Sequence, residues 1–556
     1  MKVSDLFVKC LENEGVRYVF GVPGEENEDL LFSLEGSSIK FIPTRHEQGA
    51  AFMADVWGRL TGRAGVCLST LGPGATNLVT GVADANLDKS PLVAITGQAG
   101  LGRLNKESHQ YLDVVNMFRP ITKWNAAVST PDSVPEIVRK AFKVAESEKP
   151  GATHIELPED VAKMSSDRKP IRAIRVRRPD PDSTALHEAV GLIERSHRPL
   201  IIAGNGAIRK LASRHLREFA SKHRIPVAHT FMGQGAISDD SPQSLLTIGL
   251  GIRDYVMEAV EAADLIITVG YDLAEYSPEM WNPRADKTIV HIDFTPAEVY
   301  QQYQPAVEVV ADISATLREI NQLLDVADCS FDTEWYVPIR DRIRADIASY
   351  ELHEGQSFTI PGTLNILRKI MGEEDLLISD VGSHKIWIAR NFPTYTPNGC
   401  LISNGLASMG IALPGGVAAA LHSPSRRIVA AMGDGGFLMN SQELETAKRI
   451  GAGFTVVIFN DNDYGLISWK QRKAHGRATG TGLTNPDFKA YAESFGIAGY
   501  RPRTVTELQQ QLRQAVTSGQ LAVVEVPVDQ RVNLELTEKL TRWEEGRKLH
   551  ADAALD

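Results

Sequence analysis

Short apolar runs alternate with amphipathic stretches along almost the whole chain. Continuous apolar strands separated by helical patterns are typical of parallel sheets that are covered on both faces. The pattern therefore predicts an α/β protein built from doubly wound parallel-sheet domains. The clearest runs are YVFGV (18–22), AGVCLST (64–70), LVAIT (92–96), PLIIAG (199–204), DLIITVG (264–270), TIVHID (288–293), DLLISD (375–380), RIVAAMG (427–433), TVVIFN (455–460) and LAVVEV (521–526).

Two stretches interrupt this alternation. Residues 165–183 are basic, carry proline and show no periodicity, and residues 325–362 form a long polar stretch. Segments of this kind are typical of linkers, and a chain of 556 residues is too long for a single core. We therefore expect three domains, at residues 1–165, 185–325 and 360–535.

Composition and charge argue against several classes of function. The net charge of −11 argues against a large basic surface for nucleic acid, and no apolar run reaches the roughly 20 residues that span a bilayer. The amphipathic start, MKVSDLFVKCLENEG, lacks the features of a signal peptide. The cysteines are far apart, which disfavours zinc and a disulfide framework and favours a reducing cytoplasm. They are Cys10, Cys67, Cys329 and Cys400.

Two of the apolar runs end in a carboxylate. RIVAAMG is followed by Asp434 and TVVIFN by Asp461. Both strands flank one helix, so their carboxyl ends should meet at one edge of a parallel sheet, where ligands bind in such folds. Two carboxylates beside a phosphate at the helix start would need a cation, and Mg²⁺ suits oxygen ligands. For each motif taken alone, an ordinary Asx turn is the alternative.

The residues around Asp434 add to this prediction. Gly433, Gly435 and Gly436 would let the backbone turn sharply and approach a ligand. Asn440, with Glu443 three residues later, is predicted to cap a helix over residues 441–450.

The segments GDGGF (433–437) and FNDND (459–463) together resemble the motif of thiamine diphosphate enzymes. The resemblance implies that Asp434 and Asp461 bind Mg²⁺ through their side chains and Asp463 through its carbonyl. It also implies an acid against N1′ of the aminopyrimidine ring, and Glu47 in RHEQG (45–49) falls at that place. Taken alone, Glu47 could be a surface acid paired with its neighbour Arg45.

Two further segments supply the rest of the implied cofactor site. ISNGLASMGIALPGGVAAA (402–420) would place a methionine under the cofactor and a carbonyl on its 4′-amino group; a core methionine is the plain alternative. SDVGSHKIWIAR (379–390) would contact the diphosphate. The implied cofactor contacts are Gly382, Ser383, His384, Ala407 (carbonyl), Met409 (under the cofactor), Gly433, Asp434, Gly435, Gly436, Asp461 and Leu466.

The resemblance covers roughly residues 1–530 and is closest to acetolactate (acetohydroxyacid) synthases of the FAD-independent catabolic type. These enzymes add the two-carbon unit of decarboxylated pyruvate to a second 2-oxo acid. Matching stretches include STLGPGATNLVTGVADA (69–85) and SHQYLDVVNMFRPITKW (108–124). Active-site roles are implied for Glu47, Gln110, Phe118 and Lys123. For the last three, a loop amide, a core ring and a surface lysine are the alternatives.

Other features indicate which cofactor and which second substrate to expect within this family. The loop YDLAEYSPEMWNPRAD (271–286) differs from that of FAD-containing synthases, and AGNGA (203–207) is a lone glycine turn, so we predict no FAD. Where biosynthetic synthases carry tryptophan this chain has Lys470, beside Trp469, which makes pyruvate the expected second substrate. Glu25 stands where these synthases usually have a small residue near the cofactor. It either alters the choice of acceptor 2-oxo acid or begins a helix.

The resemblance also implies a homodimer or homotetramer with active sites between subunits. Within the cofactor class, the alternative is another thiamine diphosphate-dependent 2-oxo acid decarboxylase or carboligase. An FAD-containing pyruvate oxidase is an alternative of a different class, and a nucleotide-binding regulatory protein without catalysis is a third.

Overall fold

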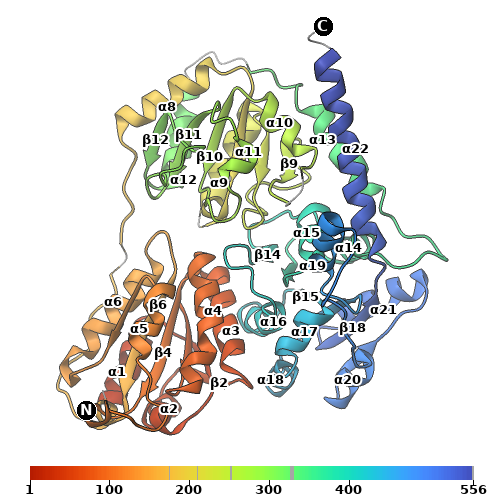
Figure 1. Cartoon of the computed structure of the whole chain (residues 1–556). Helices are drawn as coiled ribbons and strands as arrows, with labels where there is room; N and C mark the ends of the chain where they lie inside the picture. The colour runs from red at the N-terminus through yellow and green to blue at the C-terminus, as the bar shows by residue number, and fades with distance from the viewer. Residues whose placement is uncertain (105, 175, 210, 251–252, 326–330, 554–556) are drawn as a thin grey trace. The chain divides into compact units, whose positions relative to one another are not determined.

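The computed structural model describes residues 1–104, 106–174, 176–209, 211–250, 253–325 and 331–553. Three six-stranded sheets organise the described chain, and the strand pairs within them are parallel (Figure 1). The predicted α/β class with doubly wound parallel sheets is therefore confirmed. Cys10, Cys67 and Cys400 are buried free thiols, whereas Cys329 lies outside the described residues.

The first sheet has the strand order β2-β1-β3-β4-β6-β5. A buried apolar cluster lies between this sheet and helices α1, α2, α6 and α7, while α3 and α4 pack against strands β1, β3 and β4. The bounds are β1 Tyr18–Gly21, β2 Lys40–Pro43, β3 Gly65–Ser69, β4 Leu92–Gln98, β5 Trp124–Ala127, β6 Ala152–Pro158, α1 Val3–Asn13, α2 Glu28–Glu35, α3 Glu47–Thr61, α4 Pro73–Leu87, α5 Val114–Phe118, α6 Val134–Glu146 and α7 Glu159–Lys163.

The second sheet has the order β12-β11-β10-β7-β8-β9, and helices α8, α9 and α12 share its buried core. The bounds are β7 Pro199–Ala203, β8 Val227–His229, β9 Ser244–Thr247, β10 Leu265–Val269, β11 Thr288–Asp293, β12 Val307–Val310, α8 Ser183–Arg195, α9 Ala212–His223, α10 Val256–Ala262, α11 Pro278–Trp281, α12 Ile313–Leu324 and α13 Val337–Ala348.

The third sheet has the order β14-β13-β15-β16-β18-β17. Its bounds, with those of the helices around it, are β13 Leu376–Ser379, β14 Cys400–Ile402, β15 Ile428–Gly433, β16 Thr455–Asn460, β17 Ala498–Tyr500, β18 Ala522–Pro527, α14 Ile360–Ile370, α15 Ser383–Asn391, α16 Ala412–His422, α17 Asp434–Asn440, α18 Glu443–Arg449, α19 Gly465–His475, α20 Phe488–Ser494, α21 Val505–Thr517 and α22 Arg531–Ala553.

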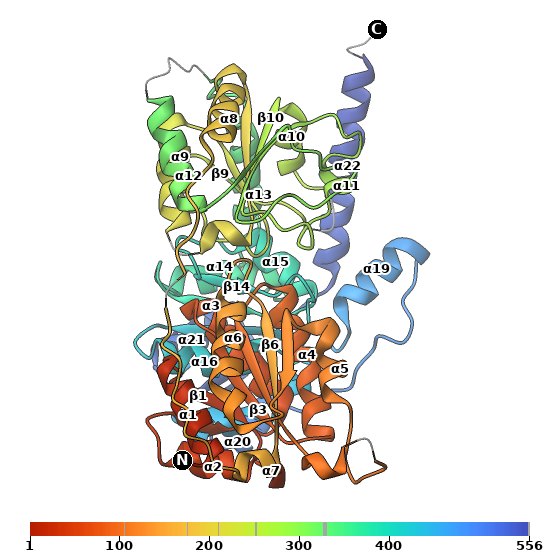
Figure 2. The same cartoon turned by 90° about the vertical axis from the view of Figure 1, so that its left-hand side faces the viewer.

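The charged C-terminal tail forms α22, one long helix (Figure 2). The helix is fastened along its length: Lys539 pairs with Asp346 of α13, and the indole of Trp469 in α19 donates to the hydroxyl of Thr537 over 2.8 Å. No helix of the described chain combines the length and apolarity that a bilayer span requires.

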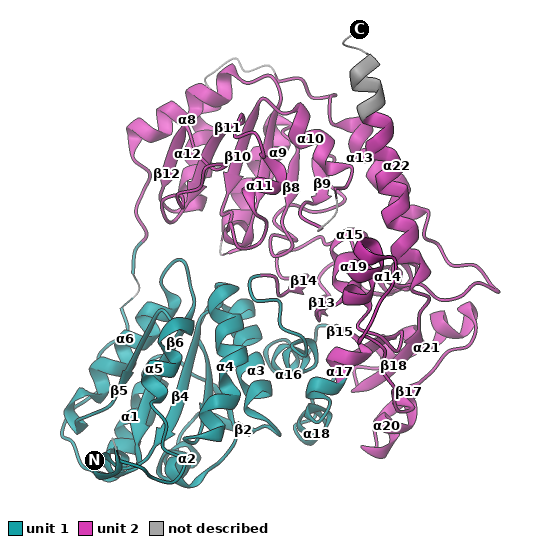
Figure 3. Ribbon diagram, viewed as in Figure 1, with its two compact units in different colours: residues 1–177, 405–430, 438–454 teal, residues 178–404, 431–437, 455–556 magenta. Residues whose placement is uncertain are grey.

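The described chain divides into two compact units (Figure 3). Unit 1 comprises residues 1–177, 405–430 and 438–454, and unit 2 the remaining residues. The segment 405–454, which includes strand β15 of the third sheet, is thus divided between the units. The three predicted domains, 1–165, 185–325 and 360–535, stay a prediction.

Candidate active site

The two carboxylates predicted to bind a metal lie together at one edge of the third sheet. Strand β15 ends at Gly433 and its neighbour β16 ends at Asn460, so Asp434 and Asp461 both emerge at the carboxyl edge. Burial and the charge of Asp434 raise the pKa of Asp461 to about 8, and burial raises the pKa of Asp434. A bound cation would favour the ionised form of both acids.

The oxygen donors at this edge fit a hard cation such as Mg²⁺. Within the described ranges, no group of three or more His, Cys, Asp or Glu side chains is placed to hold a metal ion. A cation here would therefore take its remaining ligands from carbonyl, phosphate or water oxygens. The N–H of Asp463 donates to Oδ1 of Asp461 over 3.1 Å, which folds the 461–463 turn against that acid.

His384 lies beside the two acids with an unused ring nitrogen. The ring is buried, stacks on Phe459 at 6.0 Å between centroids, and leaves Nε2 without a hydrogen-bond partner. Burial lowers the pKa of His384 to about 3, so the ring is neutral. A Cβ added at Gly382 would lie 2.8 Å from this ring, and one added at Gly433 3.3 Å from it. The site therefore has a buried polar atom that a phosphate could satisfy.

Other predicted cofactor contacts gather at the same edge. Ser383 begins α15, and a Cβ added at Gly465, the first residue of α19, would lie 2.5 Å from Oδ2 of Asp461 and 3.1 Å from Oγ of Ser383. Gly465 therefore brings the start of α19, with Leu466 next in sequence, against both residues. Gly435 and Gly436 follow Asp434 in the first turn of α17.

Glu47 lies at the carboxyl edge of the first sheet, as its place after β2 predicts. It is the first residue of α3, is 8% exposed, and accepts a hydrogen bond from the amide of Asn77 over 2.9 Å. A Cβ added at Gly74 would lie 3.3 Å from its Oε1. Glu47 is therefore held by α4 and has no bond to Arg45 among the described contacts, so the alternative of a paired surface acid is wrong.

Comparison with known proteins agrees with this geometry. Family models for thiamine pyrophosphate (thiamine diphosphate) enzymes match residues 1–117 as the N-terminal TPP binding domain, 186–320 as the central domain and 380–526 as the C-terminal TPP binding domain. The chain belongs to the thiamine pyrophosphate enzyme family. The N-terminal match contains Glu47, and the C-terminal match contains Asp434 and Asp461.

Relatives of this thiamine pyrophosphate enzyme confirm the predicted resemblance. An acetolactate synthase of Bacillus subtilis (strain 168) is 34% identical over 96% of this chain and 94% of its own. A catabolic acetolactate synthase of Raoultella terrigena is 37% identical over 95% of each chain. The chloroplastic acetolactate synthase 2 of Nicotiana tabacum is 33% identical over 90% of this chain and 78% of its own.

The other predicted active-site residues lie in different parts of the first sheet and its surroundings. Gln110 is exposed in a loop with φ of +57°, and its backbone and Cβ pack on Gly72 just before α4, whose Asn77 holds Glu47. Phe118 is fully buried and stacks on His154 at 4.2 Å between centroids. Gln110 therefore belongs to the edge that carries Glu47, whereas Phe118 is a core ring of the first sheet.

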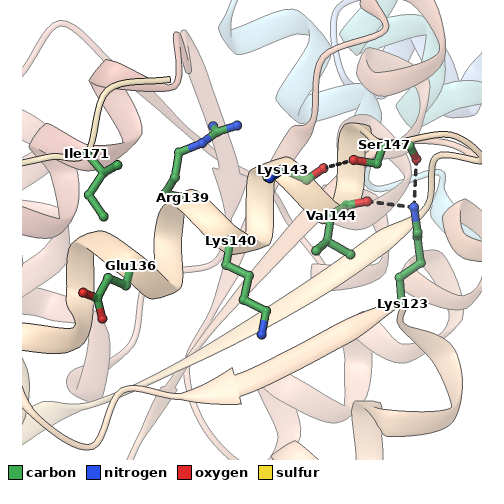
Figure 4. Close-up of a pocket in the computed structure, with 8 residues that line it drawn as sticks. All are labelled: Lys123, Glu136, Arg139, Lys140, Lys143, Val144, Ser147 and Ile171. Atoms are coloured by element: carbon green, nitrogen blue, oxygen red, sulfur yellow. Dashed lines mark hydrogen bonds between the residues drawn. The ribbon is translucent and has the colours of Figure 1, made fainter. Parts of the chain in front are cut away.

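Lys123 lies at the opposite edge of the first sheet, because it precedes β5. Its ammonium donates to the carbonyls of Val144, Ser147 and Lys149 over 2.7 to 2.8 Å, so it binds the end of α6. Figure 4 shows two of these bonds at an open hollow of about 670 Å³. The hollow is lined by Lys123, Glu136, Arg139, Lys140, Lys143, Val144, Ser147 and Ile171. This position matches the alternative of a surface lysine better than an active-site role.

The predicted helix cap at Asn440 is wrong. The chain turns helical at Asp434 itself, and Asn440 is the last residue of α17. Its amide donates to the carbonyl of Gly410 over 2.9 Å, and α18 begins at Glu443 after Gln442 without a side-chain cap. The capping pattern misleads because both polar side chains bond to other segments.

Glu443 instead organises the segment that leads to Glu47. Its fully buried carboxylate accepts the backbone N–H groups of Arg45 and His46, each over 3.1 Å, and the hydroxyl of Thr446 over 2.6 Å. Burial raises the pKa of Glu443. The sequence pattern gives no sign of this contact, which joins residues almost 400 positions apart.

Asn485 is a second residue that the sequence motifs miss. Its amide donates to Oδ2 of Asp434 over 2.5 Å and to the side-chain oxygens of Asn460 and Asn462, each over 3.1 Å. It thus orients the first acid from a loop paired with the 462–464 segment, where the N–H of Leu483 donates to the carbonyl of Asn462. An asparagine in a loop carries no local signal of such a role.

The glycine turn AGNGA (203–207) of the second sheet is a connection between a strand and a helical turn. Residues Asn205–Ile208 form one turn of 3₁₀ helix after β7. The backbone N–H groups of Asn205 and Met232 donate to the carboxylate of Glu275 over 3.1 and 2.9 Å. Two N–H groups at the carboxyl edge of this sheet therefore donate to Glu275 of the same chain. That the enzyme binds no FAD stays a prediction.

Proposed function

We propose that this chain is a thiamine diphosphate- and Mg²⁺-dependent acetolactate synthase that takes pyruvate as its second substrate. The observation that carries the proposal is the pair Asp434, which is buried, and Asp461, which is half-buried, at the carboxyl edge of the third sheet beside the unpartnered Nε2 of His384. The acetolactate synthases that match almost the full chain point to the reaction. The acceptor is inferred from Lys470, which is exposed, whereas Trp469 is turned into the contact with α22.

Each group of residues would have a separate task. Asp434 and Asp461, with the carbonyl of Asp463, would hold Mg²⁺, and Gly382, Ser383 and His384 would bind the diphosphate. When bound, the cofactor would supply the carbanion chemistry that the decarboxylation of a 2-oxo acid needs. Glu47 would hold a proton at the aminopyrimidine N1′. Gln110 would orient the small 2-oxo acid substrates.

The proposed assembly is a homodimer or homotetramer in the cytoplasm. Four large apolar side chains of unit 1 lie on its surface around the turn 405–410: Leu87, Leu406, Leu438 and Met439 are 38 to 42% exposed. A Cβ added at Gly405 would lie 2.6 Å from the Leu87 carbonyl, and one added at Gly410 3.3 Å from Cβ of Met439. Grouped exposed apolar residues are typical of a protein interface, here with a second copy of the chain.

One reaction tests the function directly. The purified protein is incubated with pyruvate, thiamine diphosphate and Mg²⁺, and the products are identified. Acetolactate with CO₂ is expected. Acetaldehyde would instead indicate a simple decarboxylase, and acetyl phosphate with peroxide an oxidase.

Two substitutions separate catalysis from cofactor binding. Glu47→Gln should nearly abolish turnover but retain the cofactor, because the amide keeps the shape and loses the acid. Asp434→Ala should abolish cofactor retention, because one metal ligand is gone. Both are measured by acetolactate formation and by the thiamine diphosphate that remains after gel filtration. Full activity in Glu47→Gln would refute the assigned role.

A further inference from the structure

The turn formed by residues 405–410 is fastened to the end of α4 by two carboxylates. The N–H of Gly405 donates to Oδ1 of Asp88 over 2.5 Å, and the N–H of Ser408 donates to Oδ1 of Asp84 over 3.1 Å. Asp84 and Asp88 are one helical turn apart, so both face the same side of α4. All of these residues belong to unit 1.

The turn is also held at Gly410 and by the close approach of Gly405 to α4. The amide of Asn440 donates to the carbonyl of Gly410 over 2.9 Å. A Cβ added at Gly405 would lie 2.6 Å from the carbonyl oxygen of Leu87, so this residue must be glycine for the turn to rest on α4. The turn is therefore held at three points, each of them a side chain that is 1% exposed or less.

The two carboxylates are themselves held by a buried arginine. Nη2 of Arg59 in α3 lies 3.5 Å from Oδ2 of Asp84 and also bonds to Asp88, while Nε lies 2.9 Å from Oδ1 of Asp55. Three buried carboxylates thus share one guanidinium. Burial and the charges of Asp88 and Asp55 raise the pKa of Asp84 well above its usual range.

Such a cluster is a costly way to fill a core, because buried ion pairs rarely recover their desolvation energy. What it does provide is a pair of acceptors in fixed positions under the turn. Between the two anchored N–H groups lies Ala407, whose φ of +59° is a left-handed conformation that residues other than glycine avoid. The anchors maintain this conformation and so aim the Ala407 carbonyl.

We propose that Asp84 and Asp88 are positioning residues that hold the 405–410 turn in the shape that receives the aminopyrimidine of the cofactor. The proposal rests on the proposed function, in which Ala407 offers its carbonyl and Met409 its side chain to that end of the cofactor. The diphosphate end is assigned to other residues, Gly382, Ser383 and His384. Loss of the anchors should therefore weaken binding of the whole cofactor and spare binding of its diphosphate part.

Calorimetric titration of Asp84→Ala with two ligands tests this. Removing one charged hydrogen-bond acceptor should weaken thiamine diphosphate binding by about tenfold or more in the presence of Mg²⁺. The affinity for Mg²⁺ with inorganic diphosphate should stay within about twofold of the wild type, since its proposed site is untouched. Asp84→Asn should restore most of the affinity for thiamine diphosphate, because the amide oxygen can still accept from Ser408.

Two further variants keep the test decisive. Asp55→Asn is the matched control: it alters the same buried cluster but has no bond to the turn, so it should lower the melting temperature and leave both affinities unchanged. If Asp84→Ala does not fold, Gly405→Ala tests the same point, because its Cβ would lie 2.6 Å from the Leu87 carbonyl oxygen and 2.6 Å from Oδ1 of Asp88. This variant displaces the turn while all three carboxylates remain, and it should show the same selective loss.

The outcomes separate this inference from the proposed function. Equal loss of both ligands, or no loss of either, in the folded variants overturns the positioning role. Selective loss of thiamine diphosphate supports it even if the wild-type enzyme forms no acetolactate from pyruvate, a result that would overturn only the proposed function.

Discussion

At the scale of single residues, Asp461 carries the strongest electrostatic conflict of the candidate site. It is half-buried beside a second carboxylate, and without a cation burial and the charge of Asp434 raise its pKa to about 8, so that it holds a proton at neutral pH. A divalent ion would displace this proton and give both carboxylates a favourable contact. The same residue should therefore destabilise the metal-free protein and strengthen metal binding.

Asp461→Asn separates these two effects. At neutral pH the variant should have a higher melting temperature than the wild type in the absence of Mg²⁺ and cofactor, because Asp461 must take up a proton on folding beside Asp434 and the amide need not. It should also need about tenfold or more Mg²⁺ for half-maximal cofactor binding, since a charged ligand becomes neutral. Thermal melts and Mg²⁺ titrations measure both; a variant less stable without metal would contradict the argument.

Glu156 in β6 gives a pH-dependent prediction away from the metal. Its carboxylate is 5% exposed and accepts from the amide of Gln98 over 2.8 Å, and burial raises its pKa from 4.5 to about 7. The folded state thus binds this proton more tightly than the unfolded state. Stability is lost as the pH rises from about 4.5 to about 7, by at most about 3 kcal/mol.

Glu156→Gln should remove that part of the pH dependence. The variant is expected to gain about 1–2 kcal/mol over the wild type at pH 8 and nothing at pH 4.5. Urea unfolding at both pH values measures the difference. Glu159→Gln, three residues along on the surface, is the control and should leave the wild-type slope in place.

At the scale of elements, the apolar pattern located ten of the twelve inner strands of the described sheets, but it missed the inner strands β6 and β8 and the edges of the sheets. All ten quoted runs are strands in the structure. The six edge strands, β2, β5, β9, β12, β14 and β17, are absent from that set. An edge strand has one neighbour and is often half-exposed, as the alternating burial of β12 shows, so it lacks a continuous apolar run.

The site follows the same division. Glu47, which follows the edge strand β2, was implied by the resemblance. Asp434 and Asp461 could be placed from the sequence because each follows a buried strand, and topology decides where such a strand ends. Glu443, Asn485 and Asp84 could not, because each acts through a contact with a segment distant in the sequence. Phe118 and Lys123 were implied by resemblance alone, and their surroundings in the fold are a core and a helix end.

The contact of α18 with the start of α3 gives an element-scale prediction. Glu443→Ala leaves the N–H groups of Arg45 and His46 without their acceptor, which should destabilise the protein by about 1–3 kcal/mol for each group. Glu443→Gln should lose less, because one oxygen remains. Urea unfolding measures both.

Glu445 supplies the matched control on the same helix. Its partly exposed carboxylate forms an ion pair with Arg449 at 3.0 Å. Glu445→Gln should therefore change stability by no more than about 0.5 kcal/mol. If the two glutamine variants lose the same amount, the contact of Glu443 with the Glu47 segment has no special weight.

At the scale of the whole molecule, the proposed assembly depends on which chain supplies each half of the site. Glu47 belongs to unit 1 and Asp434 to unit 2. If each site takes Glu47 from one subunit and Asp434 from another, the inactive variants Glu47→Gln and Asp434→Ala can complement each other. A mixed dimer then has one site with both substitutions and one site with neither.

The two variants should therefore regain activity when they are mixed, dissociated and reassociated. Random pairing makes half of the dimers mixed, and each mixed dimer has one intact site, so about a quarter of the wild-type activity is expected in a closed dimer. Acetolactate formation before and after reassociation measures the gain, and each variant treated alone is the control. If both residues of a site come from one chain, no pairing creates an intact site and activity stays at the background of the single variants. The size of the recovery thus decides whether the subunit interface completes the active site.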